Sequence, residues 1–216
     1  MKEIPVVYLD QDILIVNKPY GLAVQGGAGI SICLIDVLES QMGEKIYPVH
    51  RLDRDTSGLM ILCRSSRSAA MYTNILGQGE TSKRYQAVCF GKPPRPSDRI
   101  IMPAGKAGKR KSADTLYTLL GSTSDISLLD LELGTGRMHQ IRLHLASIGC
   151  PIIADDKYGD FPKNRSVRSE YGIRKLQLAA YSLTVPIGGI ARQFSIPLPQ
   201  HMSSCLDSFG LSALTE

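Results

Sequence analysis

The chain has 216 residues, of which 43% are hydrophobic and 21% are charged, and its net charge is +5. This composition excludes an intrinsically disordered chain, and the length suits one domain with a substantial core. The excess of cations fits a polyanionic partner such as nucleic acid, and it fits an ordinary basic enzyme equally well.

The first half of the chain alternates short apolar runs with helical patterns. Asp10-Gln11-Asp12 separates two apolar runs, and Ser31 is placed to cap a helix that extends to Met42. Gly77 and Gly79 end a second helix. In chain order, the sequence predicts strands at 6–9 and 13–16, a helix at 31–42, a strand at 58–63, a helix at 66–76 and a strand at 83–91.

The second half continues with alternating strand patterns and one well-marked helix. "KPPRPSD" after residue 91 is predicted to be a loop, and Gly149 closes the helix. The predicted elements are strands at 114–120 and 126–133, a helix at 137–149, a hairpin of strands at 176–185 and 191–196, and a short helix from about residue 203.

Strands outnumber helices, and short loops join most successive strands. The sequence therefore predicts an α+β fold with a largely antiparallel, mixed β-sheet core flanked by helices. No repeat or linker marks a boundary, so residues 1–216 are predicted to form a single domain. Residues 103–113 and 157–172 are predicted to be the least ordered.

The cysteines and the first residues of the chain indicate in which cellular compartment the protein is located. The five cysteines are far apart and form no CxxC pair, which is typical of a reducing compartment. Acidic residues interrupt the first twelve positions, where a signal peptide would need an apolar run, and no apolar run approaches the length of a membrane span. A cytoplasmic protein that does not bind membranes is expected.

The stretch "VHRLDRDTSG" (49–58) crowds charge against the start of a strand that is predicted to be buried. A carboxylate there needs cations or donors to stay ionised, and such an aspartate is a plausible nucleophile or base. Arg51, Arg54 and Arg142 are the available cations. The alternative is an Asp-Thr-Ser turn with a purely structural role. A magnesium-dependent aspartate phosphatase is a further alternative, because "DRDTS" and "ADDKYGD" (154–160) vaguely resemble the acidic clusters of such enzymes.

The predicted helix 137–149 contains "HQIRLH" (139–144). Arg142 lies one step off the apolar stripe of this helix, so it is either a surface residue or the partner of a buried carboxylate. His139 and His144 are five positions apart and do not share a face, so no metal site is predicted. The stripe consists of Met138, Ile141, Leu145 and Ile148.

A basic run occupies the predicted loop "GKAGKRKS" (105–112). Its cations can lie along a phosphate backbone, and the alternative is a solvated loop. They are Lys106, Lys109, Arg110 and Lys111.

Several motifs in the same order resemble pseudouridine synthases of the RluA type. They are "VNKPYGL" (16–22), "HRLDRDTSGLMIL" (50–62), "SKRYQAV" (82–88), "GKRKSADTLYTLL" (108–120) and "GTGRMHQIRLHLASIGCPIIADDKYG" (134–159). The resemblance covers roughly residues 6–200. It implies that Asp53 is the catalytic aspartate, that Tyr85 is the active-site tyrosine and that Arg142 pairs with Asp53. Ala154 departs from the family pattern, which usually has glycine there.

The resemblance implies the pseudouridine synthase fold and the isomerisation of uridine to pseudouridine in rRNA or tRNA, without a cofactor or metal ion. The target uridine must leave its stack. Arg51 and Arg54, with the four cations of the basic run, are expected to contact RNA. The chain starts too close to the first motif to include an N-terminal S4 domain, and a monomer is expected. A non-catalytic RNA-binding protein is the remaining alternative.

Overall fold

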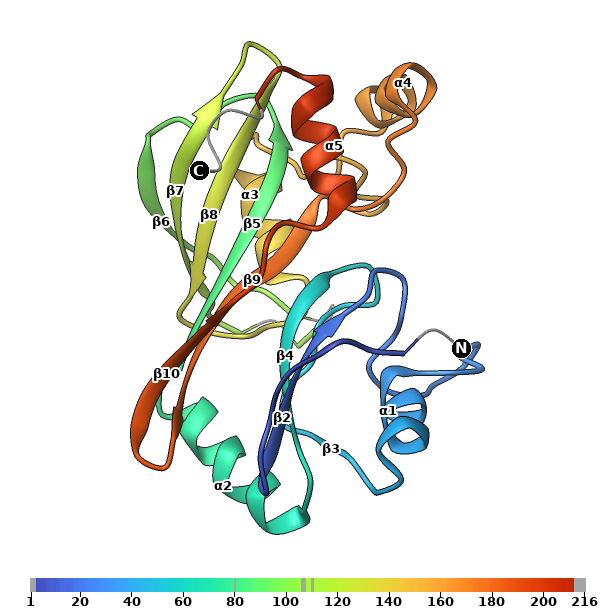
Figure 1. The fold of residues 1–216 in the computed structure, drawn as a ribbon. Helices are drawn as coiled ribbons and strands as arrows, with labels where there is room; N and C mark the ends of the chain where they lie inside the picture. Colours follow the sequence, from blue (N-terminus) through green and yellow to red (C-terminus); the bar gives the residue numbers. More distant parts are fainter. Residues whose placement is uncertain (1–2, 80, 106–107, 110, 212–216) are drawn as a thin grey trace. The chain divides into compact units, whose positions relative to one another are not determined.

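The computed structural model describes residues 3–79, 81–105, 108–109 and 111–211. Contacts divide the chain into two compact units. The first comprises Met1–Lys83 with Ala180–Pro197, and the second comprises Arg84–Ala179 with Leu198–Glu216. The sequence predicted one domain without a boundary; the two units are described separately below (Figure 1).

The first unit is built on antiparallel strand pairs. β1 (Val6–Leu9) pairs with β2 (Ile13–Lys18), which pairs with β4 (Ser57–Cys63). The two-residue β3 (Tyr47–Pro48) also pairs with β4, and β10 (Ile190–Ser195) pairs with β9 (Leu178–Ile187). Every residue of β4 is buried, which explains its uninterrupted apolar run.

Helices α1 (Leu34–Met42) and α2 (Ser66–Gly77) complete the first unit. The predicted cap at Ser31 is wrong: the helix starts at Leu34, because the Asp36 carboxylate accepts a hydrogen bond from the Cys33 backbone N–H at 2.9 Å. Ser65 caps α2, and its hydroxyl accepts a bond from the Ser68 N–H. Tyr72 of α2 packs into a core formed by apolar residues of β2, β4 and β9.

The described residues of the second unit include the strands β5-β8-β7-β6 in this order, all paired antiparallel. Their bounds are β5 (Ser82–Phe90), β6 (Ser97–Ile101), β7 (Asp114–Ser122) and β8 (Ile126–Leu133). The sequence missed β6, because "KPPRPSD" contains three prolines. β6 pairs only with β7 in the described chain and is therefore an edge strand.

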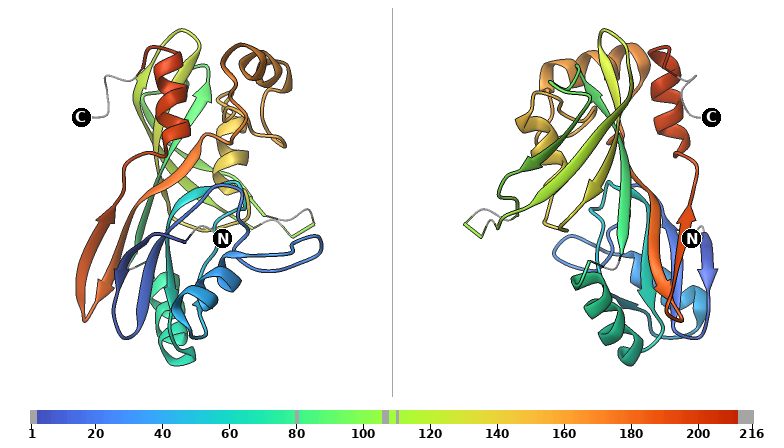
Figure 2. Two further views of the ribbon diagram at one scale, coloured as in Figure 1. Left: turned by 45° about the vertical axis from the view of Figure 1, so that its right-hand side comes forward. Right: turned by 90° about the vertical axis from the view of Figure 1, so that its left-hand side faces the viewer.

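Among its described residues, the second unit has the helices α3 (Gln140–Ser147), α4 (Phe161–Tyr171) and α5 (Gln200–Ser208). Val167 of α4 and Met202 of α5 pack in one apolar cluster with β5 and β8. Figure 2 shows these helices and the sheet of the unit from two further sides. The predicted α+β fold with a largely antiparallel sheet flanked by helices is thus confirmed, and no helix in the described residues has the length and apolar character needed to cross a membrane.

Two predictions about the helices of the second unit are wrong. Residues 157–172 are not poorly ordered, because they contain α4. Helix 137–149 is shorter than predicted: His139 has a left-handed backbone conformation with φ of 54°, so α3 begins at Gln140. Met138 therefore lies outside the helix and is 43% exposed, whereas Ile141 and Leu145 are buried as predicted.

Candidate active site

Asp53 lies directly before β4, at the first position of a tight turn. The Thr56 N–H donates to the Asp53 carbonyl at 3.1 Å, and the buried strand starts at Ser57. The Asp53 side chain is partly exposed. The observed turn spans residues 53–56, whereas the structural alternative considered for "DRDTS" placed an Asp-Thr-Ser turn at residues 55–57, where Ser57 already belongs to β4. A turn that begins at Asp53 fixes the backbone from which the carboxylate extends.

His50 holds the segment before Asp53 against β4. Its Nε2 accepts a hydrogen bond from the Ile61 N–H at 3.2 Å, continuing the pairing that β3 begins. Burial, with a smaller effect from the Lys83 charge, lowers the pKa of His50 to about 3. The imidazole is therefore neutral at neutral pH, as an accepting ring nitrogen requires.

Lys18 fixes the turn from the other side. This residue is 0% exposed, and its Nζ donates to the carbonyl oxygens of Pro19, Leu22 and Arg54 at 2.8–2.9 Å. Burial lowers the pKa of Lys18 to about 8, against the opposing charges of Asp55 and Asp53. The Asp53 turn and the "NKPYGL" loop are thus joined through one buried ammonium.

Sequence reasoning quoted the "VNKPYGL" motif but assigned no role to Lys18. The available signal was a charged residue at the end of the apolar run "ILIV", in a strand whose other residues are almost all buried. A lysine in such a place needs several acceptors, and carbonyls of neighbouring loops are the usual source.

The predicted RNA-binding cations of the first unit differ in their surroundings. Arg51 is exposed. Arg54 is exposed too, but its guanidinium donates to both oxygens of Asp55, at 3.1 and 3.2 Å. An exposed pair of this kind is worth little energy, so Arg54 can exchange Asp55 for a phosphate at small cost.

The basic run belongs to the second unit and is only partly described. Lys109 and Lys111 are exposed, and Lys106 and Arg110 lie outside the described residues. Ala104 and Lys111 exchange two backbone hydrogen bonds of 3.0 Å.

Arg142 is 5% exposed and forms a two-pronged ion pair within the second unit. Its Nε donates to Asp155 Oδ2 at 2.8 Å, and its Nη2 donates to Asp155 Oδ1 at 2.7 Å and to Asp156 Oδ1 at 3.0 Å. The sequence placed Arg142 at the edge of an apolar stripe and named a buried carboxylate as one possible partner. Asp155, thirteen positions later, is such a partner and was missed.

Asp155 is fully buried, and both of its carboxylate oxygens accept hydrogen bonds. Besides Arg142, the backbone N–H groups of Lys157 and Tyr158 donate to Oδ1 at 2.9 Å. Burial alone would raise the pKa of Asp155, but the bonds from Arg142 and from the two backbone groups lower it overall. The pair is therefore charged at neutral pH. Its signal in the sequence was "ADDKYG", an aspartate followed by a turn that supplies N–H donors.

The other polar residues of "HQIRLH" contact neighbouring segments of the second unit. Buried Gln140 accepts from Thr135 Oγ1 and the Arg137 N–H, and its Nε2 donates to the Asp114 carbonyl at 2.8 Å. His139 Nδ1 lies 3.0 Å from the Tyr158 hydroxyl, and His144 Nε2 lies 3.0 Å from the Met102 carbonyl. In the part of the chain that is described, no cluster of His, Cys, Asp or Glu side chains could hold a metal ion.

Tyr85 lies on β5, opposite Leu131 of β8, and is buried. Its neighbour Arg84 pairs with the buried Asp130 of β8, which adds a second cross-strand contact at this position. Tyr85 and Arg142 belong to the second unit, and Asp53 belongs to the first. The pairing of Arg142 with Asp53 stays a prediction.

Comparison with known proteins identifies the family. The sequence profile described as "RNA pseudouridylate synthase" matches residues 12–147. "Ribosomal large subunit pseudouridine synthase C" of Rickettsia prowazekii is 34% identical over 169 residues, covering 71% of this chain and 56% of the relative. A mitochondrial pseudouridylate synthase of Rattus norvegicus is 30% identical over 233 residues, covering 89% and 62% respectively. The chain thus spans a little over half the length of these curated relatives.

A solved structure agrees with this result. The human RNA pseudouridylate synthase domain containing 4 superposes with a TM-score of 0.81 at 25% identity, covering 94% of this chain and 92% of the human chain. The family profile contains Asp53, Tyr85 and Arg142 within its matched range. The chain belongs to the RNA pseudouridylate synthase family.

Proposed function

We propose that the protein converts uridine in RNA to pseudouridine, with Asp53 as the catalytic aspartate. One observation carries the proposal: the "HRLDRDTSG" aspartate heads a turn that Lys18 holds in place and that leads into the fully buried β4. Family membership supports the same reaction. Family membership gives no support to the alternative of a magnesium-dependent aspartate phosphatase.

The reaction breaks the N-glycosidic bond of uridine, turns the uracil and forms a C–C glycosidic bond. Atoms and charge balance within the substrate, so no co-reactant is required. Asp53 acts as a nucleophile on the uracil ring, as a nucleophile on the sugar carbon, or as a base on a sugar proton. A rigid turn favours each of these roles, because it limits the positions of the reacting oxygen.

Tyr85 and Arg142 complete the proposed catalytic set. Tyr85 offers a flat face for uracil and a hydroxyl for proton transfer. Arg142 would hold Asp53 ionised. Asp155 and Asp156 account for its Nε and Nη2 donors, so a contact to Asp53 would use Nη1.

The proposed substrate is rRNA or tRNA, and the name of the Rickettsia prowazekii relative, ribosomal large subunit pseudouridine synthase C, favours rRNA. The uridine is flipped out of its stack, and Arg51 fills its place or binds a phosphate. Arg54 and the basic run at residues 106–111 add contacts to the RNA backbone. We also propose a cytoplasmic monomer; the five cysteines are buried free thiols, which suits a reducing compartment.

The test is to map pseudouridines in RNA from cells with and without this gene, and then to treat the unmodified RNA with purified protein. Asp53→Asn should abolish pseudouridine formation and leave the RNA dissociation constant nearly unchanged, since it keeps the size of the side chain. Asp55→Asn is the matched control two positions away and should retain turnover within a few-fold. Turnover by Asp53→Asn near that of the unchanged protein would refute the assignment.

A further inference from the structure

Residues 157–175 carry a concentration of positive charge that the proposed active site does not use. This segment has six cations and two carboxylates, a net charge of +4 in a chain whose total is +5. It follows the range matched by the family profile, which ends at residue 147. The basic run at residues 106–111 is the other concentration of cations, and the remainder of the chain is net negative.

The positive segment is held in a defined shape by α4. At the start of the helix, the Asp160 carboxylate accepts a hydrogen bond from the Lys163 N–H at 3.0 Å. At its end, Gly172 has a left-handed conformation, and its N–H donates a hydrogen bond to the Val167 carbonyl. Asn164 accepts from the Ala154 N–H and donates to the Asp155 carbonyl at 2.9 Å. The helix is thus joined directly to the loop that holds Arg142.

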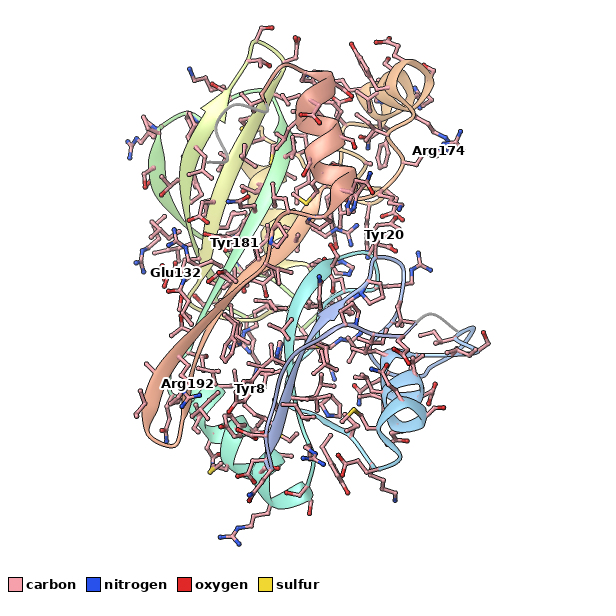
Figure 3. All side chains as sticks on the ribbon, in the orientation of Figure 1. Tyr8, Tyr20, Glu132, Arg174, Tyr181 and Arg192 are labelled. Carbon is pink, nitrogen blue, oxygen red and sulfur yellow. The ribbon has the colours of Figure 1, made fainter. Side chains whose placement is uncertain are left out.

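Three arginines of this segment point away from the core. Arg165 and Arg168 are exposed one turn apart on α4, and Arg174 is exposed after the helix. Figure 3 shows Arg174 projecting outward from the second unit. Within the described residues, none of the three forms an ion pair, so their charges are available to an anionic partner.

A cavity of about 260 Å³ lies between the end of α4 and α5. Its lining includes Tyr171, Arg174, Lys175, Gln177 and His201, and no described carboxylate. Two other cavities within the units do include carboxylates: one of about 560 Å³ has Asp10 and Asp12 in its wall, and one of about 400 Å³ has Asp125 and Glu170 together with Lys163. Of these three cavities, the α4–α5 cavity is therefore the one best suited by charge to an anionic ligand.

Two residues of this cavity match a nucleotide in particular. Tyr171 is 46% exposed and its ring contacts Phe209 with centroids 5.0 Å apart, which supports the ring from one side. Gln177 is 1% exposed, and its Oε1 accepts no hydrogen bond within the described residues. An unpaired nucleobase supplies a flat face for the tyrosine and N–H donors for the amide oxygen.

We propose that the cavity between α4 and α5 is a nucleotide-binding site for single-stranded RNA. One base stacks on Tyr171, its phosphate lies against Arg174, and the adjoining backbone follows Arg168 and Arg165 along α4. The proposal rests on the proposed function insofar as the bound strand belongs to the RNA that is modified. Stacking on aromatic side chains with cations along the backbone is the general way in which proteins hold single strands.

The first test measures RNA binding in the Asp53→Asn background, so that no turnover occurs. The probe is a fluorescein-labelled decamer of uridine, followed by anisotropy over a range of salt concentrations. Arg165→Ala/Arg168→Ala/Arg174→Ala should reduce the slope of log K against log salt by about 2, which is three contacts at about 0.7 each, and weaken binding on the order of 100-fold at 0.1 M salt. Tyr171→Ala should weaken binding about 5- to 150-fold, and Tyr171→Phe should bind normally.

The matched control removes the same charge elsewhere. Lys45, Arg67 and Lys92 are exposed and lie outside the segment. Lys45→Ala/Arg67→Ala/Lys92→Ala should keep the slope of the unchanged protein. Equal slopes for the two triple variants would overturn the proposal, because only net charge would then matter. All six positions are exposed, and unchanged melting temperatures would exclude misfolding as the cause of a loss.

The second test locates the base by photocrosslinking with a decamer of 5-iodouridine and mass spectrometry. An adduct on Tyr171 is expected, and adducts elsewhere in the chain without one on Tyr171 would contradict the site. The two proposals fail separately. If RNA is not isomerised but the Tyr171 adduct and the slope change are found, the nucleotide site stands and the proposed function falls. If pseudouridine forms and the arginine variant matches its control, the site falls and the proposed function stands.

Discussion

Replacement of Arg142 by alanine should destabilise the second unit strongly, because it would strip a buried carboxylate of its cation. Asp155 receives two bonds from Arg142 and two from backbone N–H groups, and the aspartate is 0% exposed. In Arg142→Ala only the backbone donors would remain. Breaking a buried pair in this way costs on the order of 3–5 kcal/mol of the free energy of unfolding.

The loss should depend on pH in a specific direction. The folded-state pKa of Asp155 is lower than its unfolded value, so its stabilising contribution is present above the unfolded pKa and is lost as pH falls through the folded pKa. Without Arg142, burial would dominate and raise this pKa. The variant would then bind a proton more readily when folded, and its deficit relative to the unchanged protein should shrink as the solution is acidified.

Urea denaturation followed by circular dichroism at neutral and mildly acidic pH measures both effects. Arg99→Ala is the control, because it removes an exposed ion pair with Asp114 and should cost less than about 1 kcal/mol. Arg142→Ala/Asp155→Ala removes both charges and should be more stable than Arg142→Ala alone. A cost for Arg142→Ala similar to that of Arg99→Ala, without pH dependence, would refute this account of the pair.

Three further predictions concern the backbone and the buried lysine. Lys18→Met removes three charge-assisted hydrogen bonds and should lower the free energy of unfolding by on the order of 2–3 kcal/mol. Burial lowers the folded pKa of Lys18 from 10.5 to about 8, so the unchanged protein should gain stability relative to this variant as pH rises above 8. If the difference in free energy of unfolding between the two proteins stayed constant with pH, Lys18 would not be buried as described. Gly58→Ala would place a Cβ 2.1 Å from the Ala180 carbonyl oxygen at φ of +115°, so it should unfold at a much lower temperature, whereas Gly26→Ala, with open space, should not. Ala154→Gly should raise the free energy of unfolding by up to about 1 kcal/mol, because Ala154 has a left-handed φ of 59°, and a lower melting temperature would contradict this reading.

The sequence predicted elements well where burial imposes a period. The β9–β10 hairpin is an example, since its turn residues and alternating pattern are visible in the sequence. The prediction from sequence failed for α4. Val167 is the single buried residue of that helix, so its sequence has no periodic apolar pattern that would indicate a helix. The helix depends instead on its caps and on Asn164, whose partners lie in a preceding loop. Contacts of that kind follow from the tertiary fold and leave no periodic signal.

For the candidate site, too, the sequence indicated what chemistry the side chains could perform but not which contacts hold them in position. The residue types led to the prediction that Asp53 is a reactive carboxylate, but they did not indicate the buried ammonium that fixes its turn, because Lys18 reaches carbonyls as far as 36 positions away. The sequence named a buried carboxylate as one possible partner of Arg142, and the structure shows ion pairs with Asp155 and Asp156, while the pairing with Asp53 stays a prediction.

The nitrogens of Arg142 that donate to Asp155 distinguish its structural role in the second unit from its proposed role toward Asp53. Asp155 binds Nε and Nη2, and a planar guanidinium held at two of its nitrogens has a fixed direction for the third. If Asp53 is the partner of Nη1, then Asp155 positions the arginine and the arginine acts on Asp53. Arg142→Lys can keep a charge near Asp155 but cannot reproduce the fork, so it should recover part of the stability and little of the activity. Equal recovery of both would mean that Arg142 contributes only its charge, and a directed contact from its guanidinium to Asp53 would not be needed for activity.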